Sequence, residues 1–223
     1  ARADVYELIP CGEQGVMIFY ESIKEIDDQS KAWVFIFYDQ LLQPVWSLEI
    51  PVYRDLKFQD HYLQDKNVFL AFQKTEKARR DEYNFQILEI DIANGDFKGK
   101  TMFVPDNATL VSFKVWGDRF VAGLNYDKDE AILLIRDLNT DAEASVQFTD
   151  KPTFIEDVRI DPASGEITTA LTLYTSRRES ELYVNTYDDE AVLLSSVRIA
   201  PPYPTQKLMN AQVNFMPDNE LYV

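Results

Sequence analysis

The sequence has few of the residues that build disulfide frameworks, metal sites and glycine-rich repeats. It contains one cysteine, Cys11, one histidine, His61, and 7 glycines among 223 residues. A single cysteine cannot form an internal disulfide, and so few glycines exclude collagen-like and glycine-rich classes. We expect Cys11 to be a small structural residue in a turn. One cysteine and one histidine do not readily supply a zinc site, and we expect neither a metal nor a cofactor.

Basic residues and long apolar runs are also scarce. Only 22 Lys and Arg stand against 38 Asp and Glu, which gives a formal net charge of -16. Such a field repels phosphate backbones and anionic lipid, so we expect no nucleic-acid partner. The longest apolar run, Ala32 to Tyr38, is far shorter than the roughly 20 residues that span a bilayer, so we expect a soluble chain without membrane insertion. Removal of an export signal before Ala1 would favour a periplasmic or cell-surface location, but the compartment stays open.

Strand-forming residues dominate what is present. Hydrophobic residues make up 46% of the chain, and 12 Tyr and 14 Phe contribute to an aromatic content of 13%. No stretch longer than about ten residues keeps the apolar spacing of an amphipathic helix. The composition and spacing together predict an all-β protein.

A short apolar strand recurs along the chain after a polar turn. Its first residues are separated by 52, 52, 47 and 54 positions. Its copies are residues 16–20, 68–72, 120–124, 167–171 and 221–223. Since the turns that precede them are rich in Gly, Asn and Asp, each copy is predicted to follow a tight connection.

Each copy belongs to a unit of about 50 residues with four predicted strands. One strand precedes the recurring strand, at 6–9, 56–63, 110–116, 154–160 and 211–215. Two more follow it, first at 33–38, 85–90, 132–136 and 182–187, then at 45–50, 101–104, 145–148 and 193–199. An aspartate directly follows the first of these two strands in every unit, at Asp39, Asp91, Asp137 and Asp188.

Four short strands in a unit of this length are typical of a propeller blade. The chain resembles the β-propeller superfamily in period and strand order, without a WD40 or kelch signature, and it looks like uncharacterised exported bacterial propeller-like proteins. We expect a single propeller-like domain over 1–223, with blades at about 4–52, 53–105, 106–150 and 151–204 and a partial blade at 205–223. The fifth unit ends inside its second strand, which favours part of a larger propeller in a longer chain. Otherwise the leftover hairpin closes a ring or pairs with another molecule in an oligomer. Stacked sandwiches and other all-β arrangements are the alternatives.

The run from Trp33 to Tyr38 is apolar at every position. A strand with one solvent-exposed face would alternate between apolar and polar residues. We therefore expect this strand to lie between two neighbouring blades, with both of its faces covered.

Two predicted loops carry the densest basic clusters, and in a propeller both loops belong to the same face. These residues are Lys74, Lys77, Arg79 and Arg80 in one loop and Arg177 and Arg178 in the other. The face is a candidate site for a carboxylate-bearing or sulfated partner. Acids are interleaved with both clusters, which favours the plainer interpretation of solvated hairpin tips.

The candidates for catalysis are weak. His61 lies beside Asp60, but no Gly-x-Ser-x-Gly turn supplies a nucleophile. The acid-rich turns at 91–96 and 137–141 lack the ligand pattern of a calcium loop and suit turn chemistry instead. We therefore expect a non-catalytic interaction module that binds a protein or a glycan. The alternative is a propeller-type hydrolase or lyase whose active site the sequence does not identify.

Overall fold

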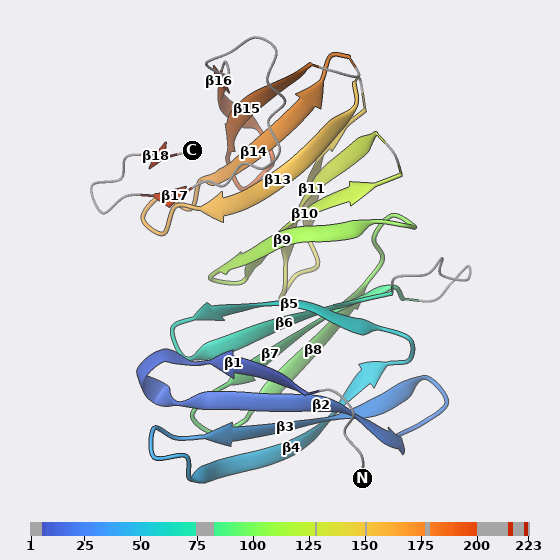
Figure 1. Ribbon diagram of the computed structural model, residues 1–223, viewed down its shortest axis with the longest axis vertical. Coiled ribbons are helices and arrows are strands. Elements are labelled where there is room, and N and C mark those ends of the chain that lie inside the picture. The colour runs from blue at the N-terminus through green and yellow to red at the C-terminus, as the bar shows by residue number, and fades with distance from the viewer. Residues whose placement is uncertain are drawn as a thin grey trace. The chain divides into compact units, whose positions relative to one another are not determined.

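The computed structural model describes residues 6–74, 83–127, 129–149, 151–176, 179–199, 214–215 and 221–222. Regular structure in these residues is β-strand apart from one 3-10 turn, η1 (Gly12–Gln14). Sixteen of the strands form four antiparallel sheets, and within each sheet consecutive strands pair in chain order (Figure 1). The predicted all-β, propeller-like fold with four four-stranded blades is confirmed.

The chain divides into two compact units, Ala1–Val104 and Pro105–Val223, and each contains two of the four-stranded sheets. The first sheet of the first unit consists of β1 (Glu7–Pro10), β2 (Val16–Glu25), β3 (Ser30–Tyr38) and β4 (Pro44–Tyr53). The second consists of β5 (Lys57–Gln64), β6 (Asn67–Gln73), β7 (Phe85–Asp91) and β8 (Phe97–Met102).

The second unit repeats this arrangement. Its first sheet consists of β9 (Thr109–Trp116), β10 (Arg119–Tyr126), β11 (Glu130–Asp137) and β12 (Glu143–Phe148). Its second sheet consists of β13 (Thr153–Ile160), β14 (Ile167–Tyr174), β15 (Ser180–Tyr187) and β16 (Leu193–Ile199). The predicted fifth hairpin is present as an antiparallel pair, β17 (Asn214–Phe215) and β18 (Leu221–Tyr222). The assignment of 1–223 to one domain, with its blade boundaries, stays a prediction.

The first hairpin is longer than its sequence predicts. Residues 21–31 read as a loop because charged residues replace the apolar ones, but β2 continues to Glu25 and β3 begins at Ser30. Glu25 pairs with Lys31 across the hairpin. Backbone pairing therefore continues beyond the apolar segment, since a ladder of amide hydrogen bonds does not require a buried face.

Aromatic side chains hold the two sheets of the first unit together. Phe19 is fully buried, stacks on Phe35 with ring centroids 5.2 Å apart, and meets the edge of Phe58 at 4.9 Å. Trp33 meets Phe72 of β6 edge-on at 4.9 Å. Offset-stacked and edge-to-face pairs of this kind add to the hydrophobic stabilisation of a core.

The strand expected to be covered on both faces is covered on one. Trp33, Phe35 and Phe37 are buried in the core of the first unit. The alternating residues of β3, Val34, Ile36 and Tyr38, are only partly buried. The expectation is therefore met for the face that packs on β5–β8 and not for the other face.

Aliphatic residues form the core of the second unit, which joins β9–β12 to β13–β16. Its centre includes Val121, Leu133, Ile155 and Leu171. A Cβ atom at Gly123 would lie 2.7 Å from Cγ2 of Ile155. Glycine at this position therefore lets β10 approach β13 closely.

The recurring aspartates close the turn between the third and fourth strands of every sheet. Oδ1 of Asp39 accepts hydrogen bonds from the amides of Leu41 and Gln43, at 2.8 and 2.9 Å. The other three aspartates accept from backbone amides of their own turns in the same way. The acid-rich turns are thus Asx turns, as their sequence predicts.

Replacing Asp39 with alanine is expected to lower the free energy of unfolding by about 1 kcal/mol, because two turn amides lose their acceptor. Asp39→Asn is the matched control, since its side-chain carbonyl can accept the same hydrogen bonds. Urea denaturation of the three proteins measures the difference. Equal losses for the two variants would show that the negative charge, and not the acceptor, stabilises the turn.

Candidate functional site

The predicted basic face falls mostly outside the described residues. Lys77, Arg79, Arg80, Arg177 and Arg178 all lie outside them. Lys74 directly follows β6, and its amide donates a 2.9 Å hydrogen bond to the carbonyl of Asn84. Lys74 therefore belongs to the base of the β6–β7 hairpin, and its grouping with the other basic residues stays a prediction.

The surroundings of Cys11, Asp60 and His61 are those of structural residues. Cys11 is 2% exposed, and burial raises the pKa of its thiol, which disfavours the reactive thiolate. The register of β5 shifts between Phe58 and Asp60. Directly after that bulge, Oδ1 of Asp60 accepts a 2.8 Å hydrogen bond from the amide of His61. The bulge in β13 has the same arrangement, with Asp157 accepting from the amide of Val158.

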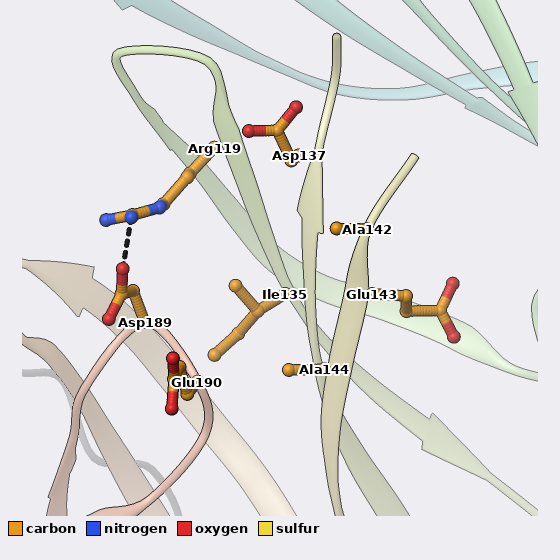
Figure 2. Close-up of a pocket in the computed structure, with 8 residues that line it drawn as sticks. All are labelled: Arg119, Ile135, Asp137, Ala142, Glu143, Ala144, Asp189 and Glu190. Atoms are coloured by element: carbon orange, nitrogen blue, oxygen red, sulfur yellow. Dashed lines mark ion pairs between the residues drawn. The ribbon is translucent and has the colours of Figure 1, made fainter. Parts of the chain in front are cut away.

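The most distinctive cavity lies in the second unit and has a volume of about 370 Å³. Three segments build it: the start of β10, the β11–β12 hairpin, and the turn between β15 and β16. Ala142 and Ala144 contribute apolar surface to the cavity, and Ile135, which pairs with Ala144 across β11 and β12, is buried beneath it. We call this cavity the acidic pocket because its charged residues are mainly carboxylates (Figure 2).

Four acids and one base line the acidic pocket. Arg119 reaches across to the β15–β16 turn and forms an ion pair with Asp189 (Figure 2). Its guanidinium also lies over the ring of Trp116, 5.6 Å from the ring centroid. The remaining acids are Asp137, Glu143 and Glu190. The pocket therefore has a surplus of negative charge although Arg119 lies within it.

Two of these acids already have structural partners. Oδ1 of Asp137 caps its turn by accepting from the amides of Asn139 and Thr140. Glu143 forms an ion pair with Arg136 at 3.4 Å. Within the part of the chain that the structure describes, Glu190 has no cationic side chain paired with it. Its carboxylate is the group best placed to receive a cation from outside.

A second cavity of about 310 Å³ lies at the corresponding end of the β5–β8 sheet, and its charges are better balanced. Lys66 pairs with Asp91 at 3.3 Å, and Lys98 with Glu89 at 3.8 Å. The third acid that lines this cavity, Asp96, accepts a 2.8 Å hydrogen bond from the side-chain amide of Asn94. Of these two cavities in the described residues, the acidic pocket has the larger surplus of acids over bases, four to one against three to two.

The acidic pocket has the side chains to bind a positively charged group. Within the described ranges, no group of three or more His, Cys, Asp and Glu side chains is arranged to hold a metal ion. An apolar surface beside carboxylates matches a long basic side chain, whose methylenes pack while its charged end pairs with an acid. Sequence reasoning missed this pocket because its residues come from distant segments, and each acid taken alone resembles an ordinary turn residue.

The described chain is an all-β, propeller-like protein with an acidic pocket at one end of its third and fourth sheets. No helix in the described residues combines the length and the apolar character that a membrane crossing requires. No protein-family model matches the chain. No curated protein sequence matches it either.

Comparison with solved structures finds distant likenesses. A member of the DUF4221 family from Bacteroides vulgatus is 9% identical with a TM-score of 0.45, over 88% of this chain and 86% of that one. Hsv2 of Kluyveromyces lactis is 12% identical with a TM-score of 0.44, over 83% and 58% of the two chains. The cobalt-substituted apocarotenoid oxygenase of Synechocystis is 7% identical with a TM-score of 0.42, over 85% and 60%. This chain thus spans about 60% of the length of the last two.

Proposed function

We propose that the chain is a non-catalytic interaction module of the β-propeller superfamily that binds a protein partner, and that the acidic pocket receives a lysine or arginine side chain of that partner. The observation that supports this proposal is the combination of an apolar surface, from Ala142 and Ala144, with the carboxylate of Glu190. The sequence alone did not decide whether the partner is a protein or a glycan. A neutral glycan has no cation to pair with this carboxylate, so the pocket favours a protein.

The net charge of the chain also supports a protein partner. The chain carries a formal net charge of -16, so its field attracts basic partners and speeds their association. The volume of about 370 Å³ is at the small end of the range for ligand sites, which suits one side chain more than a large ligand.

Binding of a lysine-rich peptide to the purified chain is expected to weaken about tenfold, or about 1.4 kcal/mol, when Glu190 is replaced with lysine. Glu166→Lys is the matched control, because it makes the same change of net charge at an exposed turn outside the pocket. Fluorescence anisotropy with a labelled peptide measures both affinities. Equal weakening by the two variants would mean that only the overall charge of the chain attracts the peptide.

The alternative function is tested on the same protein. A screen of the chain against glycosides, esters and peptides would reveal turnover if it were a hydrolase or lyase. Turnover that one acidic substitution abolishes would overturn the proposal of a non-catalytic module.

A further inference from the structure

The free edge of the β13–β16 sheet is apolar and exposed. β16 is the last strand of this sheet, and no strand in the described ranges pairs with its other side (Figure 1). An edge strand presents a row of backbone N–H and C=O groups along that side, ready to pair with another chain. We call this side of β16 the free edge. Four large aliphatic side chains that are 51–56% exposed lie on it or directly before it: Val192, Leu193, Leu194 and Val197.

The corresponding edge strands of the other three sheets are better protected against pairing. β4 contains Pro44 and Pro51, which have no backbone N–H to donate, and β8 contains Lys98 and Lys100. β12 begins with a glutamate and exposes no large hydrophobic side chain, whereas β4 and β8 expose one each. β16 has no proline, and its one charged residue, Arg198, is near its end. The free edge therefore combines open backbone groups with apolar side chains.

Backbone pairing and charge together select what can bind at the free edge. Its N–H and C=O groups are matched by an extended segment of another chain. The turn that leads into β16 contains three acids, of which Asp188 caps the turn and Asp189 pairs with Arg119. The third, Glu190 of the acidic pocket, lies three residues before Leu193. A segment paired with β16 therefore ends beside a carboxylate, which complements a basic residue at that end.

We propose that an extended segment of the protein partner adds to the β13–β16 sheet as one more strand, antiparallel to β16, with apolar residues along the free edge. A lysine or arginine at the C-terminal end of this segment enters the acidic pocket. That second statement rests on the proposed function, whereas pairing along the free edge does not depend on it. The antiparallel direction is the slightly more stable one, and it brings the C-terminal end of the segment to the start of β16.

Fluorescence anisotropy with a synthetic peptide tests the added strand. In the probe, valine and threonine alternate over about six residues, the usual length of a strand, and two lysines follow at the C-terminal end. A second peptide has the same residues, with every amide of the alternating stretch N-methylated. It keeps the side chains and charges but has no N–H to pair, so it is expected to bind at least about tenfold more weakly.

Two variants of the chain carry the same substitution on different edge strands. Val197→Asn removes an apolar side chain from the free edge and is expected to weaken binding of the probe about tenfold. Val45→Asn is the matched control, because Val45 is a 50% exposed valine on the edge strand β4. Neither change alters the net charge or a buried residue. Binding is also expected to slow hydrogen exchange of the backbone amides of residues 193–199 and not of β4.

The outcomes separate this proposal from the proposed function. Equal binding of the two peptides, equal weakening by the two variants, or unchanged exchange at residues 193–199 would overturn the added strand, even if Glu190→Lys weakens binding. Slowed exchange at residues 193–199 together with full affinity of Glu190→Lys would overturn the acidic pocket and leave the added strand standing. A dimer that forms without peptide and that Val197→Asn dissociates would show that a second copy occupies the free edge, which also overturns the proposal.

Discussion

Replacing Phe19 with alanine is expected to lower the free energy of unfolding by about 3–5 kcal/mol. Phe19 is fully buried and contacts three aromatic rings, those of Trp33, Phe35 and Phe58. Removing it takes away the transfer free energy of a phenyl ring and leaves a cavity that rigid aromatic neighbours fill poorly. Because Phe58 lies on β5, the loss weakens the contact between the two sheets of the first unit as well as the β1–β4 sheet.

Ile23→Ala is the control for this substitution, since Ile23 lies on the same strand and is 86% exposed. We expect it to change the stability by no more than about 0.5 kcal/mol. Chemical denaturation followed by tryptophan fluorescence measures both variants, because Trp33 lies beside Phe19. A loss below 1 kcal/mol for Phe19→Ala would contradict the core as described.

The second large effect on stability is expected from replacing Gly15, which precedes β2. Its φ of 137° is rare for residues with a side chain, and a Cβ atom there would lie 2.0 Å from the carbonyl oxygen of Tyr38. The obstacle is backbone, so no side-chain rotation relieves it. Gly15→Ala is therefore expected to cost about 3–5 kcal/mol, through backbone strain and displacement of β3 together.

Gly12 provides the comparison within the same turn. It also has a positive φ, of 58°, but a Cβ atom there would meet no heavy atom within 4 Å. Gly12→Ala is expected to cost only about 1 kcal/mol, which is the ordinary penalty for a left-handed residue. Thermal unfolding of the two variants separates them, and similar midpoints would mean that the turn rearranges to relieve the contact at position 15.

Most strands were predictable because they are local apolar segments between turn residues, but β8 (Phe97–Met102) is largely polar and overlaps the predicted strand at 101–104 by only two residues. The order of the strands within each sheet followed from the short connections between them, since such connections join neighbouring antiparallel strands. Asp39 and its counterparts were recognisable for the same reason, because an Asx turn uses only residues close in sequence. Strand ends were less predictable: the β2–β3 ladder extends through polar residues that carry no apolar signal.

The acidic pocket could not be predicted in this way. Arg119 and Ile135 lie on the paired strands β10 and β11, and Glu190 joins them only because the β9–β12 and β13–β16 sheets pack against each other. Charge density along the chain pointed instead to Lys74 and to the other basic loop residues, and their common face remains a prediction. A count of local charges does not reveal which acids already have a partner, as Glu143 has in Arg136.

The sequence by itself determined that this chain forms four-stranded antiparallel sheets in a regular repeat, because the period of its apolar segments and the turn residues between them act over short distances. Only the tertiary structure decided which apolar faces are covered. Phe35 and Ile36 are adjacent and similar in hydrophobicity, yet Phe35 is buried against β5–β8 while Ile36, on the opposite face of the sheet, is only partly buried. Burial depends on which surface packs against a strand, and neighbouring side chains of one strand point to opposite faces of its sheet.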